Sequence, residues 1–191
     1  MLEASLSNRE HRTRLLEAMA HAVSRKGFAD TTIGDIVAEA SVSRRTFYEH
    51  FDSKAECLIS LYSAASHNAL KVLREAIDPS HEWRTQVQTA MREYLGFLAS
   101  NPQMVRTLSI EILHLGAEGL AVRRRVNREF ANFIVQTVNG GGRAKLSPKL
   151  AMAIVGGINE LVLEYIEQDK VAHLADLVEP AAKLVHAVTG E

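Results

Sequence analysis

Residues 28–54 of this 191-residue chain read FADTTIGDIVAEASVSRRTFYEHFDSK, and this stretch decides the fold. Thr32, followed three residues later by an aspartate, has the pattern of a capping box and predicts a short helix over residues 33–40. Ser43 is a favourable N-cap and predicts a second short helix over residues 44–51. Two short helices that are joined by a three-residue turn are typical of a helix-turn-helix.

The sequence on either side of this stretch continues the helical pattern. An amphipathic helix precedes it and is expected to end at Gly27, in the left-handed conformation of a C′ residue. The apolar stripe of this helix comprises Leu15, Leu16, Met19, Ala22 and Val23. After the stretch, Ser53 and Glu56 repeat the capping signature and predict a long helix over residues 54–77.

The remainder of the chain predicts an all-α fold with about nine helices and no strand. Further helices are expected over residues 83–99, 102–114, 120–138, 147–168 and 173–189. The glycine-rich segment 139–142 predicts a loop. We expect two domains: a three-helix helix-turn-helix domain for DNA binding over residues 1–53, and a second helical domain over residues 54–191.

The composition is that of an ordinary globular protein, with 47% hydrophobic and 24% charged residues. There are 22 Lys and Arg against 23 Asp and Glu, so no overall basic bias indicates nucleic-acid binding. Any DNA-binding surface must therefore depend on how the charges are distributed. The window from Ser43 to Lys54 is locally basic, because Arg44, Arg45, His50 and Lys54 outnumber its two carboxylates.

Several classes of function are disfavoured by what the sequence lacks. There is no run of 18 apolar residues and no secretory signal, and the single cysteine fits a reducing compartment, so we expect a cytoplasmic protein with no membrane segment. None of the eight histidines lies at H-x-x-x-H spacing, so neither a metal nor another cofactor is expected. No catalytic motif is present, so we do not expect an enzyme. Cys57 is expected to be a buried, inert thiol.

The second short helix carries the candidate DNA contacts, because this helix of the motif enters the major groove by its N-terminal residues. The expected base contacts are Ser43, Arg44, Arg45 and Thr46. Arginine can bond guanine O6 and N7 in a bidentate manner, and a threonine methyl can contact a thymine methyl. The expected phosphate contacts are Thr32, Tyr48, His50 and Lys54. Phe47 and Phe51 are expected to share the inward face.

Residues 9–60 resemble the TetR family of transcriptional regulators. The matching residues are Gly27, Phe28, Thr31, Thr32, Ile33, Ile36, Ala38, Ala40, Val42, Ser43, Thr46, Phe47, Tyr48, His50, Phe51, Lys54 and Leu58. The resemblance implies that Tyr48, His50 and Lys54 contact phosphates, while Arg44, Arg45 and Thr46 face the bases. One position departs from the family, which usually has glycine in the turn where this chain has Ser41. The serine must adopt whatever backbone angle the turn imposes.

The resemblance also implies a pocket for a small-molecule effector among the middle helices. Residues that could line it are Tyr62, Trp83, Met91, Tyr94, Phe97, Met104, Leu108, Ile112, Phe130 and Phe133. For any one of these residues, packing in a filled core is more frequent than lining a pocket. Most of these stripes lack charged residues, which favours an uncharged, hydrophobic effector.

The last two predicted helices are the candidate dimer interface, because their apolar stripes are broad and Gly156 and Gly157 permit close backbone approach. The expected interface residues are Ile154, Ile158, Leu161, Tyr165, Leu177 and Leu184. Reading a palindrome requires a two-fold dimer, which these helices would form as a four-helix bundle. Alternatively, they pack only within one subunit.

Together these patterns predict a homodimeric repressor that a small-molecule effector releases from a palindromic operator in double-stranded DNA. The effector is expected to tilt the helix over residues 54–77 and so change the separation of the two recognition helices. The alternative is a helical small-molecule-binding or enzymatic module with a vestigial helix-turn-helix. A protein-interaction bundle is a third possibility, but it leaves Arg44, Arg45 and Tyr48 unexplained.

Overall fold

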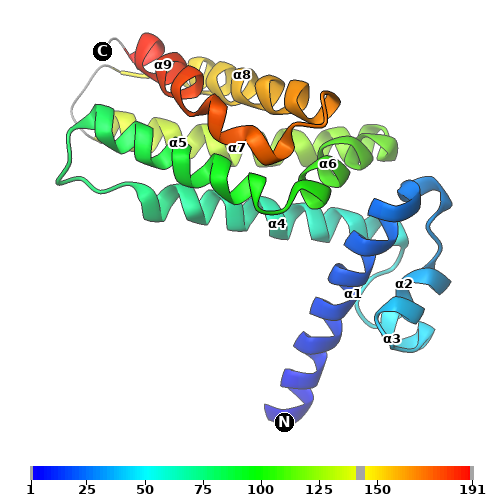
Figure 1. Ribbon diagram of the computed structural model, residues 1–191. Coiled ribbons are helices and arrows are strands. Elements are labelled where there is room, and N and C mark those ends of the chain that lie inside the picture. The colour runs from blue at the N-terminus through cyan, green and yellow to red at the C-terminus, as the bar shows by residue number, and fades with distance from the viewer. Residues whose placement is uncertain (1, 141–144, 190–191) are drawn as a thin grey trace. The chain divides into compact units, whose positions relative to one another are not determined.

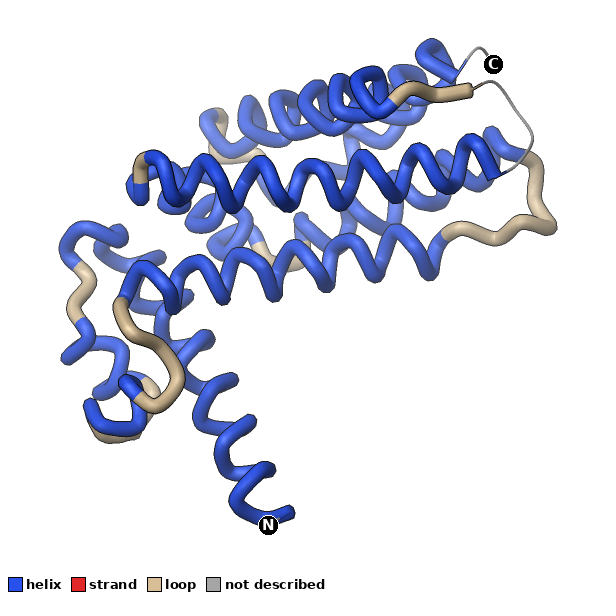
Figure 2. The backbone as a smooth tube through the Cα atoms, turned by 180° about the vertical axis from the view of Figure 1, so that it is seen from behind, coloured by secondary structure: helices blue, strands red, loops and turns tan. Residues whose placement is uncertain are grey.

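The computed structural model describes residues 2–140 and 145–189, with side chains from residue 7 onward. Within these ranges every regular element is a helix and there is no strand, which confirms the all-α class (Figures 1 and 2). The chain forms two compact units. Unit 1 comprises Met1–Ala65 and Thr107–Val122, and unit 2 comprises Ser66–Arg106 and Arg123–Glu191. Unit 1 extends beyond the expected domain limit at residue 53, because the first turns of the following helix bury Cys57 and Leu58.

Unit 1 begins with helix α1 (Leu2–Asp30), whose helical geometry is interrupted at Gly27. The φ of 77° there confirms the expected positive φ. Its ψ of 165° lies outside the left-handed helical region, and helical structure resumes for a further three residues. The predicted apolar stripe is confirmed, since its five side chains are all at most 9% exposed.

The expected capping motifs start the next three helices, α2 (Ile33–Glu39), α3 (Arg44–Tyr48) and α4 (Lys54–Ala76). The backbone N–H of Thr32 donates to Asp35 Oδ2 at 2.7 Å, and the Asp35 N–H donates to Thr32 Oγ1 at 3.2 Å, which confirms the capping box. The hydroxyls of Ser43 and Ser53 cap α3 and α4 in the same way.

Unit 2 is built mainly from α5 (Trp83–Ala99), α8 (Pro148–Glu167), α9 (Val178–Thr189) and most of α7 (Ala117–Gly140). In the sequence, α6 (Pro102–Glu111) and the 3₁₀ helix η1 (Ile112–Leu115) follow α5. The end of α6 from Thr107 and all of η1 belong to unit 1. The last predicted helix, over residues 173–189, instead begins as a second 3₁₀ helix, η2 (Val171–Leu177).

The predicted loop at residues 139–142 is only partly described. Asn139 and Gly140 are the last residues of α7, and Gly141 and Gly142 lie outside the described residues. The Asn139 side chain accepts from the Leu146 N–H at 2.8 Å and donates to the Leu146 carbonyl at 3.2 Å. These bonds tie the end of α7 to the segment before α8.

Helices α8 and α9 pack side by side in unit 2 (Figure 1). A Cβ added at Gly157 would lie 3.0 Å from Leu184 Cδ2, so this glycine permits close approach within the chain itself. Gly156, by contrast, faces open space. None of the described helices combines the length and apolar character needed to cross a bilayer.

Candidate nucleic-acid interface

Helices α2 and α3 lie beside α1 in unit 1 and form a helix-turn-helix (Figure 1). The turn between them is closed by the Val42 N–H, which donates to the Val37 carbonyl at 3.0 Å. Ser41, at the position where the family usually has glycine, has a φ of 51°. The turn therefore does impose a left-handed backbone on the serine, a conformation that costs free energy in residues with a Cβ.

The faces of α3 divide as the sequence predicts. Phe47 is fully buried and Phe51, just after the helix, is 2% exposed, with ring centroids 5.7 Å apart. This anchor leaves the N-terminal end of α3 on the surface, where Arg44 and Arg45 are exposed. Arg45 Nε pairs with Glu49 Oε1 at 3.1 Å, but its side chain is 89% exposed, so the pair is weak and easily exchanged.

The two hydroxyl residues at the start of α3 contact one another. Ser43 Oγ and Thr46 Oγ1 are 2.9 Å apart, and Ser43 Oγ also accepts from the Thr46 N–H at 3.0 Å. Ser43 is exposed and Thr46 is half-buried. The four predicted base-contact residues thus occupy the cap and first turn of α3, where the motif presents residues to DNA.

Tyr48, His50 and Thr32 are three of the predicted phosphate contacts. Tyr48 is 56% exposed and meets the Phe47 ring edge-on. His50 is half-buried, and this burial, followed by the positive charges of His11 and Arg12, lowers its pKa below the ordinary value of 6.5. The lowered pKa favours the neutral imidazole, whose ring N–H can donate to a phosphate. The Thr32 hydroxyl already donates to Asp35 Oδ2 at 2.6 Å.

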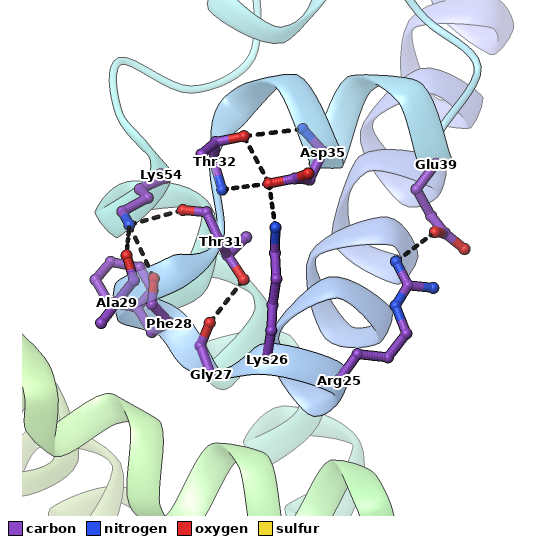
Figure 3. Close-up of polar contacts among 10 residues, drawn as sticks. All are labelled: Arg25, Lys26, Gly27, Phe28, Ala29, Thr31, Thr32, Asp35, Glu39 and Lys54. Atoms are coloured by element: carbon purple, nitrogen blue, oxygen red, sulfur yellow. Dashed lines mark hydrogen bonds and ion pairs between the residues drawn. The ribbon is translucent and has the colours of Figure 1, made fainter.

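Lys54, the fourth predicted phosphate contact, binds the end of α1 in a way that the sequence did not predict (Figure 3). Its ammonium donates to the carbonyls of Phe28 at 2.8 Å, Ala29 at 3.2 Å and Thr31 at 2.7 Å. The same ammonium lies 4.4 Å from the centroid of the Phe28 ring. Its three N–H donors are thus matched by three acceptors, and binding a phosphate would require that some of these bonds break.

The carboxylates of α2 are neutralised by basic residues of α1 (Figure 3). Lys26 Nζ lies 2.6 Å from Asp35 Oδ2, and Arg25 Nη2 lies 2.9 Å from Glu39 Oε2. The hydrogen bond from Lys26, and then those from Thr32, lower the pKa of Asp35. Arg25, and then His21, lower the pKa of Glu39. These pairs neutralise both carboxylates of α2.

A second unpredicted contact comes from Glu111, the last residue of α6. Its Oε2 accepts from the Phe28 N–H at 2.8 Å and lies 2.9 Å from His114 Nδ1. The interruption at Gly27 turns the Phe28 N–H out of the helical hydrogen-bond pattern, and the carboxylate provides its acceptor. Glu111 and Lys54 thus bind the N–H and the carbonyl of the same residue, Phe28.

The predicted effector-pocket residues are divided between the two units. Tyr62, Leu108 and Ile112 belong to unit 1, and the other seven belong to unit 2. Of the seven in unit 2, Trp83 and Met91 are at most 8% exposed and belong to its hydrophobic core.

The predicted dimer-interface residues also fall into two groups. Ile154, Ile158 and Leu177 are at most 7% exposed within the chain itself, so they are not available to a partner without repacking. The reason is that α9 and η2 already cover the inward stripe of α8. Leu161, Tyr165 and Leu184 are half-buried and keep part of their surface accessible.

Among the described residues, no group of three His, Cys, Asp or Glu side chains is placed to hold a metal ion. Cys57 is fully buried, and this burial raises the pKa of its thiol to about 12. We expect the native protein to resist thiol-specific reagents, since on the order of one thiol in 10,000 is ionised at pH 8. Labelling should reach one equivalent only in denaturant, whereas rapid labelling of the native protein would contradict the buried position.

The fold and the site together define a helix-turn-helix protein. Comparison with known proteins agrees with this class: residues 15–61 match the family model of the bacterial regulatory proteins of the tetR family. The uncharacterized HTH-type transcriptional regulator YerO of Bacillus subtilis (strain 168) is 36% identical over 69 residues, which are 35% of this chain and 24% of YerO. The chain spans between 24% and 61% of the length of the first curated relatives it matches.

Solved structures show the same fold over almost the whole chain. The fatty acid degradation regulator FadR from Bacillus halodurans superposes with a TM-score of 0.79 at 18% identity, over 92% of this chain and 94% of FadR. The transcriptional regulator FadR from Bacillus subtilis, in complex with stearoyl-CoA, gives 0.77 at 18% identity, over 94% and 98%. Residues 15–61 thus match the tetR family, and the chain as a whole has the fold of these solved regulators.

Proposed function

We propose that this protein is a DNA-binding transcriptional repressor that reads a palindromic operator with helix α3. The observation that carries this proposal is the division of α3 into a buried face and an exposed N-terminal end. Phe47 and Phe51 fix the helix on unit 1, while Arg44 and Arg45 remain exposed at the end that the motif presents to the major groove.

Within this proposal, one set of residues contacts the bases and another set contacts the phosphates. Arg44 and Arg45 carry donor groups that match the major-groove edge of guanine, and Ser43 and Thr46 contact neighbouring base edges. Tyr48, which is 56% exposed, donates its hydroxyl proton to a backbone phosphate, and His50 donates a ring N–H. Thr32 reaches a phosphate only if its hydroxyl bond to Asp35 is exchanged. Lys54 reaches a phosphate only if its bonds to α1 are exchanged.

The proposed effector is a hydrophobic small molecule bound by the helices of the C-terminal part. The structurally similar FadR from Bacillus subtilis is in complex with stearoyl-CoA, whose acyl chain is apolar and whose CoA part is charged, so it supports a ligand with an apolar chain. The effector releases DNA only if it binds the released conformation more tightly than the DNA-bound one. The accessible parts of Leu161, Tyr165 and Leu184 are the proposed contacts of α8 and α9 with a second subunit.

Selection of the purified protein against random duplex DNA tests the proposal. Wild-type protein should enrich a palindrome, since two recognition helices of a dimer read symmetric half-sites. Arg45→Ala should lose about 1–3 kcal/mol of discrimination at one base position in each half-site. Tyr48→Ala should weaken binding to all duplexes by a similar factor.

A matched control is Lys71→Ala, which removes an exposed cation from α4 outside the proposed surface. This variant should enrich the same palindrome as the wild type. Failure of the wild type to enrich any sequence, both alone and after removal of bound apolar ligand by denaturation and refolding, would contradict the proposal and favour a helical module that does not read DNA.

A further inference from the structure

The turn between α2 and α3 is held in a backbone conformation that its sequence disfavours. Ser41 has a φ of 51°, which glycine adopts freely and a serine adopts only at a cost. Any force that holds Ser41 there also determines where α3 begins, because only Val42 separates Ser41 from Ser43, the N-cap of α3. The direction in which α3 leaves the turn therefore depends on the backbone angles of Ser41 as well as on the buried side chains of Phe47 and Phe51.

Arg14 of α1 binds this turn from outside the helix-turn-helix. Its Nη2 donates to the carbonyl of Ala40 and, at 3.2 Å, to the carbonyl of Ser41. These two carbonyls belong to the peptide groups on either side of the Ser41 Cα, so a cation that bridges them restrains both backbone dihedrals of Ser41. The Ala40 carbonyl also lies at the C-terminal end of α2, where a positive charge is favourable.

We infer that Arg14 is a positioning residue, which sets the recognition helix by compensating for the absence of glycine in the turn. The inference rests on the proposed function of α3 in reading DNA. From its position among the basic residues of α1, Arg14 would be expected to add charge for phosphate binding. In the structure its guanidinium is instead committed to two backbone carbonyls. Arg9 has the same charge on the same helix and, like Arg14, is exposed.

A double-mutant cycle of Arg14→Ala and Ser41→Gly separates the two roles. We expect Arg14→Ala alone to lower affinity for the selected operator by about tenfold or more, because two charge-assisted hydrogen bonds that hold the turn are removed. In the Ser41→Gly background, Arg14→Ala should lower operator affinity by less than about threefold, because glycine adopts the left-handed conformation without steric cost. The dependence of affinity on salt concentration should keep its slope, since no phosphate contact is lost.

Arg9→Ala is the matched control and should leave amide exchange in the turn unchanged. If Arg14→Ala lowers affinity by the same factor in both backgrounds and reduces the salt slope by about 0.9, Arg14 is a phosphate contact and the inference is wrong.

A measurement without DNA keeps the inference independent of the proposed function. Amide exchange of the Val42 N–H, which bonds the Val37 carbonyl at 3.0 Å, reports closure of the turn directly. Arg14→Ala should accelerate this exchange about tenfold, and Ser41→Gly should restore most of the protection. Unchanged exchange in Arg14→Ala would overturn the inference whether or not the protein binds DNA. If Arg14→Ala accelerates Val42 amide exchange as expected but the wild-type protein binds no operator, the inference stands and the proposed function is contradicted.

Discussion

Replacing Phe47 by alanine should lower the free energy of unfolding of unit 1 by about 3–5 kcal/mol, the usual cost of removing a buried aromatic side chain. Phe47 is fully buried, and its ring contacts those of Phe51 and Tyr48 at centroid distances of 5.7 and 5.5 Å. It is the only fully buried residue of α3, a helix of five residues that has little stability of its own. Urea unfolding followed by circular dichroism measures the loss.

The neighbouring residue offers a matched control, because Tyr48 is aromatic, lies on the same helix and is 56% exposed. Tyr48→Ala should change the free energy of unfolding by less than about 1 kcal/mol. Both variants should bind DNA more weakly, Phe47→Ala because α3 is no longer held and Tyr48→Ala because a contact is lost. Equal loss of stability in the two variants would contradict the inward and outward faces assigned to α3.

The features of unit 1 that the sequence predicted are local ones. Capping at Thr32 and Ser43 depends on residues three apart, and the α1 stripe depends on helical periodicity, so a short window contains the whole signal. Ser41 was identified as a departure from the family, and its φ of 51° shows that the turn does require a left-handed residue there.

The features that the sequence did not predict are contacts between distant residues. Lys54 binds carbonyls 23 to 26 positions earlier, Arg14 binds a turn 26 positions later, and Glu111 binds an amide 83 positions away. A long basic side chain near a helix start fits a phosphate contact and a carbonyl contact equally well. Only the path of the backbone brings the acceptors within reach.

In unit 2 the sequence predicted apolar stripes but not what covers them. Ile154 and Ile158 have the helical spacing of an interface, yet they pack into the core of their own chain. Periodicity shows that one face of a helix is buried, and it contains no information on whether a neighbouring helix or a second subunit buries it. Close approach at Gly157 is likewise satisfied within the chain, by Leu184.

Lys54→Met should lower the free energy of unfolding of unit 1 by about 2–3 kcal/mol, because charge-assisted hydrogen bonds to the carbonyls of Phe28, Ala29 and Thr31 are lost together. Methionine keeps an unbranched apolar side chain of similar length, so the loss isolates the ammonium with its carbonyl bonds and its contact with the Phe28 ring. Lys71→Met, on the exposed face of the same helix, should change stability by less than about 0.5 kcal/mol.

The same pair of variants decides between the two roles of Lys54. If the ammonium serves the end of α1, Lys54→Met weakens DNA binding only through stability, and binding measured well below the unfolding transition keeps the salt slope of the wild type. A stability equal to that of Lys71→Met, together with a salt slope reduced by about 0.9, would instead assign Lys54 to a phosphate, as the resemblance to the TetR family implies.

An intermediate loss of stability with a reduced slope would mean that the ammonium exchanges its carbonyl partners for a phosphate when DNA binds. Because those partners hold Phe28, and the Phe28 N–H is bound by Glu111, that exchange would loosen the end of α1 in the DNA complex. Faster amide exchange at Phe28 in the complex than in the free protein is the direct sign of it.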